Sequence, residues 1–154
     1  MTPTLFSDVY SVFFSKITDD MYMELTKEET EKIVKDLFKN ALHYFEFPRV
    51  NIYDFNDAIE EYNIELSSEE INIIATYMIV EWLGQQLASI ENIRMKYSGS
   101  DFKFTSQANH MSKVQALKTE YERLGFHMQR LYKRRKADDK GVMRSTFGSI
   151  MDTN

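Results

Sequence analysis

The side chains that most often perform catalysis or bind metal ions are few and widely spaced in this chain of 154 residues. The sequence has no cysteine, which excludes disulfide bonds, thiolate metal sites and a cysteine nucleophile. Its histidines are His43, His110 and His127, and no two of them form an HExxH or His-x3-His pattern. Because a zinc site needs several ligands held close together, this spacing predicts no metal site.

The acidic residues give no stronger signal for catalysis. Among the adjacent acids are the pairs Glu60–Glu61 and Glu69–Glu70, and the second falls in the first turn of a predicted helix, where acids stabilise the helix dipole. Glu81 stands beside Trp82 in an apolar segment. It either reaches solvent at a boundary between helices or pairs with a basic group of a neighbour. No Ser–His–Asp arrangement follows from the spacing, so we expect no enzymatic activity and no cofactor.

A basic cluster near the end of the chain is the strongest functional signal. Five cations fall within seven residues: Arg130, Lys133, Arg134, Arg135 and Lys136. In one interpretation this is a solvated helix end, where each cation complements the dipole by about 0.3–1 kcal/mol. Five cations exceed that need. The cluster therefore favours binding to phosphate groups or to an acidic partner, with Tyr132 available for stacking.

The segment after the cluster is polar but carries five large apolar residues: Val142, Met143, Phe147, Ile150 and Met151. A segment of this length cannot bury them within itself. They either fold back on the domain or dock into another subunit and become ordered on binding. We favour docking, and predict a helical domain over residues 1–136 followed by a flexible docking arm over 137–154.

Charge is distributed unevenly along the chain, although the formal net charge is only −5. Residues 1–70 carry six basic and sixteen acidic side chains. Residues 71–129 carry six and five, and residues 130–154 carry seven and three. Such polarity is typical of a partner surface or of head-to-tail self-association.

The elements that must position these residues are predicted to be helices. Five glycines and two prolines are too few for the turns of a sandwich or barrel, and 14% aromatic residues exclude disorder throughout. Capping boxes at 26–29 and 67–70 begin two helices. The first should end near Pro48, because the residue before proline avoids the helical region. The second runs over about 71–97 and is apolar nearly all round in its first half, which predicts a central helix.

Two further helices complete the prediction. Segment 4–17 is short and apolar, and we favour a core helix over an exposed docking helix. Residues 48–66 give no firm pattern. A long helix is expected over about 107–135. The apolar seam of this helix repeats in steps of three and four and indicates packing against one neighbour, as in a coiled coil: Met111, Val114, Leu117, Tyr121, Leu124, Met128 and Leu131. The expected fold class is all-α, a small helical bundle with a long C-terminal helix and an extended C-terminal arm.

No targeting or membrane segment is expected. The apolar patch at the N-terminus has no basic region before it, which argues against a signal peptide. The longest apolar stretch, residues 71–90, is interrupted by Glu81 and Gln86 among other polar residues, and is a poor membrane span. Synthesis in a cytoplasm is expected.

Several motifs between residues 55 and 135 carry a resemblance. They are Phe55, the segment Leu66–Ile71, the clusters Tyr77–Met78 and Glu81–Leu83, and the segment Asp101–His110 leading into the long helix. With these motifs the chain resembles a family of small neck proteins of tailed bacteriophages, the head–tail connector (adaptor) proteins of long-tailed phages that infect Gram-positive hosts.

The resemblance implies a structural virion protein with neither activity nor cofactor. Its subunits would form a ring, expected to be a dodecamer, that binds the portal protein, extends the DNA channel and contacts another neck or tail protein below. Genomic DNA would pass without sequence-specific binding. The protein would be made in the bacterial cytoplasm and end in the virion. The basic cluster and the apolar arm residues would contact the portal or a neighbouring subunit.

Other functions stay open on the residues alone. Another neck or assembly protein, such as a stopper, a tail completion protein or a scaffold-like interaction protein, would show the same features. A DNA-binding regulator would use the basic helix, but no helix-turn-helix with a short glycine turn is recognisable and the net charge is negative. An enzyme is the weakest alternative because no site supports it.

Overall fold

The structure is a computed structural model that describes residues 2–18, 21, 25–96 and 104–145. Within them lie four helices: α1 (Phe6–Lys16), α2 (Lys27–Leu42), α3 (Ser68–Lys96) and α4 (Phe104–Arg134). Two antiparallel hairpins accompany them, β1 (Phe55–Asn56) with β2 (Glu61–Tyr62), and β3 (Arg135–Ala137) with β4 (Met143–Ser145). The fold is thus mostly helical, as expected, but it is not purely α.

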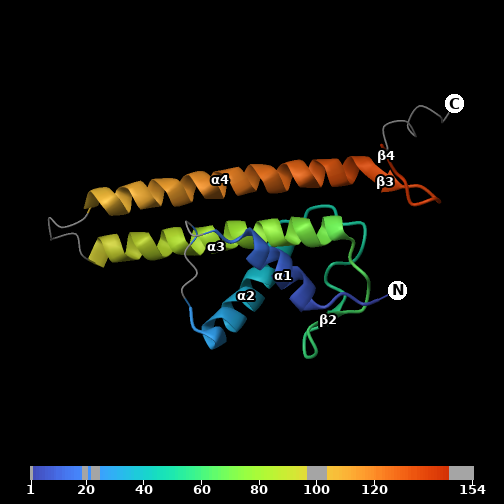
Figure 1. The fold of residues 1–154 in the computed structure, drawn as a ribbon, viewed down its shortest axis with the longest axis horizontal. Coiled ribbons are helices and arrows are strands. Elements are labelled where there is room, and N and C mark those ends of the chain that lie inside the picture. Colours follow the sequence, from blue (N-terminus) through green and yellow to red (C-terminus); the bar gives the residue numbers. More distant parts are fainter. Residues whose placement is uncertain (1, 19–20, 22–24, 97–103, 146–154) are drawn as a thin grey trace.

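Helix α3 is the central element. It contacts α1 and α2 on one side and α4 on the other (Figure 1). Each of its residues from Ile73 to Val80 is buried. A helix with neighbours on both sides needs an apolar surface nearly all round, which is what its sequence provides.

Both predicted capping boxes are present. The Thr26 backbone N–H donates to Glu29 Oε2 at 3.1 Å, and the Glu29 N–H donates to Thr26 Oγ1 at 3.3 Å. Ser67 and Glu70 make the same reciprocal pair at 2.7 and 3.2 Å. Helix α2, however, ends at Leu42 and not near Pro48. After Leu42 the backbone N–H groups of His43, Tyr44 and Phe45 each donate to the carbonyl three residues earlier, and this turn buries the Phe45 side chain.

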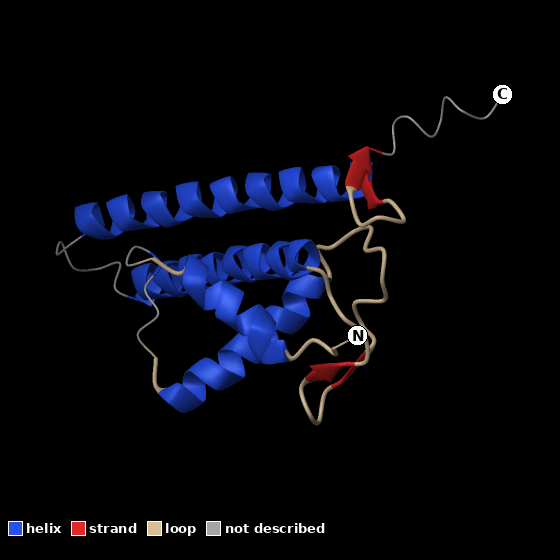
Figure 2. Cartoon of the chain, turned by 45° about the vertical axis from the view of Figure 1, so that its right-hand side comes forward, coloured by secondary structure: helices blue, strands red, loops and turns tan. Residues whose placement is uncertain are grey.

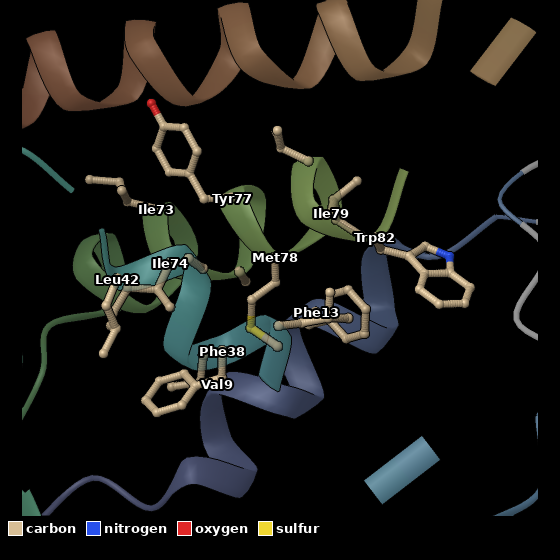
Figure 3. Close-up of a cluster of buried hydrophobic side chains, with 14 of the residues drawn as sticks. Val9, Phe13, Phe38, Leu42, Ile73, Ile74, Tyr77, Met78, Ile79 and Trp82 are labelled. Carbon is tan, nitrogen blue, oxygen red and sulfur yellow. The ribbon is translucent and has the colours of Figure 1, made fainter. Parts of the chain in front are cut away.

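The core gathers aromatic and aliphatic side chains from α1, α2 and α3 (Figure 3). Met78 points from α3 toward α1 and α2, whereas Tyr77 points toward α4. The Phe6 and Phe38 rings lie 4.5 Å apart, with Phe6 and Val9 fully buried. Helix α1 is therefore a core helix, and the alternative of an exposed docking helix is wrong.

The seam of α4 differs from the predicted one. Leu124 is 40% exposed, and Gly125 takes its place against α3. The side chains that pack are Val114, Leu117, Tyr121, Met128 and Tyr132. With Gly125 included, the steps are 3, 4, 4, 3 and 4, which follow the 3.6-residue period of a straight helix and not the 3.5 of a coiled coil.

The described part of the segment predicted as the C-terminal arm contains strands, and its docking role stays a prediction. Residues 135–145 form the β3–β4 hairpin, in which Lys136 pairs with Arg144 and Ala137 with Met143. The hairpin projects beyond the end of α4 (Figure 2). The rest of the predicted arm, residues 146–154, lies outside the described residues. We call residues 135–145 the basic hairpin.

Candidate interaction surface at the carboxyl end of α4

The predicted partner-binding residues fall on three elements. Arg130, Lys133 and Arg134 occupy the end of α4, and Arg135 and Lys136 begin the basic hairpin. Val142 precedes β4 and Met143 is its first residue. All seven are exposed to solvent. The remaining three, Phe147, Ile150 and Met151, lie outside the described residues.

Arg49 fastens the end of α4 to the helical body. Its backbone N–H donates to the Tyr132 hydroxyl at 2.8 Å, and its guanidinium lies 3.9 Å from the centroid of the Tyr132 ring. Nη2 of the same residue donates to the backbone carbonyls of Tyr132 and Arg135. The carbonyls in the last turn of a helix have no partner within the helix, and Arg49 satisfies that of Tyr132. Its second bond, to the first residue of β3, fixes where the basic hairpin begins.

Two further side chains of α4, Gln129 and Lys133, hold the turn of residues 44–49 against that helix. The Gln129 side chain donates to the Tyr44 carbonyl and the Tyr77 hydroxyl, at 2.8 and 2.7 Å, and accepts from the Glu46 N–H at 2.9 Å. Lys133 Nζ lies 4.3 Å from the ring centroid of Phe47. Since Gln129 and Lys133 both lie on α4, the last turns of that helix cannot shift without breaking contacts to residues 44–49 and to Tyr77 of α3.

Tyr132 is not available for stacking on a ligand, contrary to the prediction. Its side chain is only 1% exposed, and its hydroxyl donates to Glu70 Oε1 at 2.6 Å. Burial and this bond with Glu70 raise the pKa of the Tyr132 hydroxyl. The residue therefore ties the amino end of α3 to the carboxyl end of α4.

The turn of the basic hairpin is built around Asp138. One carboxylate oxygen accepts from the backbone N–H groups of Lys140 and Val142 at 3.0 and 2.9 Å. The other accepts from Arg144 Nε at 2.6 Å. Gly141 has φ +75°, the left-handed region that glycine adopts without strain. The hairpin thus has a defined turn although every residue of its strands is exposed.

The acidic and histidine candidates do not form a catalytic group. Glu81 accepts from the Tyr44 hydroxyl at 2.6 Å and from Asn40 Nδ2 at 3.5 Å, so its partners are neutral side chains of the α2 region and not the basic group considered from the sequence. The bond with Glu81 raises the pKa of Tyr44 to about 12. His43 follows α2, whereas His110 and His127 both lie on α4, seventeen residues apart. Among the described residues, no three His, Asp or Glu side chains gather as a metal site would require.

The exposed cations could be predicted from the sequence, but the residues that fix the end of α4 beneath them could not. Arg49 and Gln129 stand in no motif, and the bonds that they make between residues 44–49 and α4 join residues more than eighty positions apart. One feature of the sequence could have indicated a packed segment here. Phe45, Phe47 and Pro48 follow directly on a predicted helix, and a solvent-exposed turn does not need three apolar residues.

Comparison with known protein families, with curated proteins and with solved structures found no match to this chain. In the part of the chain that the structure describes, no helix has the length and apolar character needed to cross a bilayer. The function must therefore be inferred from the residues and their arrangement.

Proposed function

We propose that this protein is a structural adaptor of a tailed bacteriophage neck, a head–tail connector. Its subunits form a ring between the portal protein and the next neck or tail protein, and the ring extends the DNA channel. The expected stoichiometry is a dodecamer. The protein performs no catalysis and holds no cofactor. It is made in the host cytoplasm and becomes part of the virion.

The separation of charge in the folded chain carries this proposal. The described residues up to Glu70 hold six basic and thirteen acidic side chains, whereas residues 130–145 hold seven basic and two acidic ones. A ring needs a heterologous interface, in which one face of each subunit meets a different face of the next. Opposite charges on two parts of one subunit suit such an interface and steer its formation.

The way in which the basic end is held gives further support. Arg49, Gln129 and Tyr132 fix the end of α4, so the exposed cations and the exposed Val142 and Met143 stand on a positioned support. A preorganised surface loses less conformational entropy when it binds. Exposed apolar residues beside such a surface are typical of an interaction site.

Co-purification with the portal protein of the same genome tests the proposal. The full chain should bind the portal and give a ring of uniform mass. A truncation after Ser145 removes only the segment that contains Phe147, Ile150 and Met151, and a truncation after Arg134 also removes the basic hairpin. Both variants should keep the helical circular dichroism signal, because the core lies within residues 2–134. Both should lose portal binding.

The outcomes separate the proposal from its alternatives. A stopper, a tail completion protein or a scaffold-like protein would bind another component and leave the portal free. If the truncated chains bound the portal as well as the full chain, the C-terminal arm would have no docking role. If truncation after Ser145 unfolded the protein, that segment would belong to the core.

A further inference from the structure

We infer that the basic hairpin of one copy binds the β1–β2 hairpin of a second copy, head to tail. This inference rests on the proposed function, because it names the two surfaces through which neighbouring subunits of the ring would meet. It concerns residues 135–145 on one copy and residues 54–61 on the other, which we call the acidic hairpin.

Within the part of the chain that the structure describes, the basic hairpin contacts its own subunit mainly through the end of α4 and through the bond from Arg49 to the Arg135 carbonyl. All six residues of β3 and β4 are exposed, and its support is the end of α4. A two-stranded hairpin with no packed face is marginally stable in water. Val142 and Met143 are also 52% and 45% exposed, so burial of either side chain against a partner is favourable.

The positive side chains on the strands of this hairpin favour an anionic partner. Lys136 pairs directly with Arg144 across the two strands, which places two positive side chains on one face. Arg144 is bonded to Asp138, but Lys136 makes no ion pair among the described residues. Arg135, on the opposite face, makes none either. A carboxylate of the partner on the Lys136–Arg144 face would relieve this like-charge pair, and a second carboxylate on the other face would give Arg135 a partner.

The acidic hairpin of a second copy has the complementary chemistry. It carries Asp54, Asp57, Glu60 and Glu61, and between them Ile59 is 62% exposed, more than any other large apolar residue described. Lys35 and Lys39 of α2 offset part of this charge through ion pairs with Asp57 and Glu60. These pairs are exposed and therefore weak, and Glu61 is in none of the ion pairs described.

The positions of the two hairpins permit a repeating contact. Both hairpins lie toward the end of the molecule where α3 begins and α4 ends, the acidic hairpin on the side of α3 that carries α1 and α2 and the basic hairpin on the side that carries α4 (Figures 1 and 2). Surfaces on opposite sides of a subunit can join successive copies, as a heterologous interface requires. A second copy also suits the basic hairpin better than a nucleic acid does. A phosphate backbone would leave Val142 and Met143 exposed, and the acidic body would repel it.

Sedimentation velocity with charge-reversed full-length chains tests the inference. One variant carries R135E and K136E, and the other carries D57K and E61K. At 0.1 M salt each variant alone should dissociate to monomer, with an apparent Kd raised about tenfold or more. An equal mixture should assemble again, because each reversed hairpin then meets a complementary partner. The control K27E/K32E changes charge equally on the exposed face of α2 and should assemble like the wild type.

Assembly of either reversed variant like the wild type would overturn the inference, as would a mixture that stays monomeric. If reversal distorts the basic hairpin, the milder R135A/K136A variant must still weaken association. A chain that shifts a short DNA duplex through Arg135 and Lys136 without self-association would make the partner a nucleic acid and also overturn it. If the reversed variants still formed rings, this inference would be wrong and the proposed function would stand. If the wild-type chain stayed monomeric at every concentration, with and without the portal protein, the proposed function would be contradicted as well.

Discussion

The tyrosine hydroxyls of the core differ in whether they have hydrogen-bond partners. The Tyr62 side chain is fully buried, and its hydroxyl has no partner among the described residues. The Tyr132 hydroxyl is also buried, but it contacts both Glu70 and the Arg49 N–H. A buried polar group without a partner is destabilising, whereas removal of a bonded one leaves its partners unsatisfied.

Tyr132→Phe should therefore destabilise the fold, and Tyr62→Phe should not. We expect Y62F to leave the free energy of unfolding unchanged or raise it by up to about 1 kcal/mol, and Y132F to lower it by about 1–3 kcal/mol. Urea denaturation followed by circular dichroism measures both. Each variant removes one tyrosine hydroxyl oxygen, so each serves as the control for the other. Equal losses in the two variants would contradict the contacts described for these residues.

Single residues also show where sequence reasoning stops. The cations of residues 130–136 could be predicted as exposed because charge density is a local property. The role of Arg49 could not, because it depends on carbonyl groups that only the folded chain brings near. Tyr132 was misread for the same reason, since its burial is set by the start of α3.

At the scale of elements, the contact between α3 and α4 depends on Gly125. A Cβ added there would lie 2.7 Å from Cζ of Tyr77, whose ring is stacked on Tyr44 and whose hydroxyl is bonded to Gln129. The ring cannot move away easily. At Gly84 the nearest atom would be the flexible Cε of Lys118, at 3.5 Å.

Gly125→Ala should destabilise the fold, and Gly84→Ala should not. Overpacking costs about 1–3 kcal/mol, which exceeds the gain of about 1 kcal/mol that alanine brings to a helix. G84A keeps that gain and should stabilise by about 0.5–1 kcal/mol. Thermal melts of the two variants give the comparison. A more stable G125A would show that α4 does not approach Tyr77 as closely as described.

The capping boxes were predictable because each is defined by residues three apart in sequence. The phase of the α4 seam was not, because a glycine contributes nothing to an apolar pattern. Leu124 fitted the three-four spacing better than Gly125 did, but the Tyr77 ring fills the space that a side chain at position 125 would occupy. The basic hairpin was missed because its strands are polar and its turn depends on one aspartate.

That aspartate makes the basic hairpin sensitive to acid. The bond from Arg144, followed by those from the Val142 and Lys140 N–H groups, holds the pKa of Asp138 below its usual value. A carboxyl whose pKa is lowered by folding contributes stability above its unfolded pKa of about 3.9, and this is lost as the pH falls through the folded pKa. NMR of the Gly141 and Val142 amides should report an ordered turn at pH 5–7 and a loosened one below about pH 4.

Asp138→Asn is the control for this prediction. The amide oxygen of asparagine still accepts from the two backbone N–H groups, but it carries no charge for Arg144 and does not titrate. The amide signals of D138N should therefore not change between pH 3 and 7. An acid transition that persists in D138N would have to come from another group.

At the scale of the whole molecule, an acidic helical body carries a basic end. The mostly helical character of the fold and the polarity of charge could be predicted from sequence, since they depend on composition, on helical periodicity and on where charges fall along the chain, whereas the two hairpins were not expected. The placement of the two hairpins on opposite sides of α3 could not, because it follows from how α1, α2 and α4 divide between the two sides. With this placement, the basic hairpin of one subunit can contact the acidic hairpin of the next in the proposed ring.

Mass photometry of the full chain at 0.1 M and 1 M salt tests the central claim most directly. Exposed charges act over about 10 Å at 0.1 M salt and only about 3 Å at 1 M. We predict a single closed oligomer at low salt, alone or with the portal protein, that dissociates toward monomer at high salt. A chain that is monomeric under all these conditions, or an oligomer of the same mass at both salt concentrations, would contradict assembly through complementary charge.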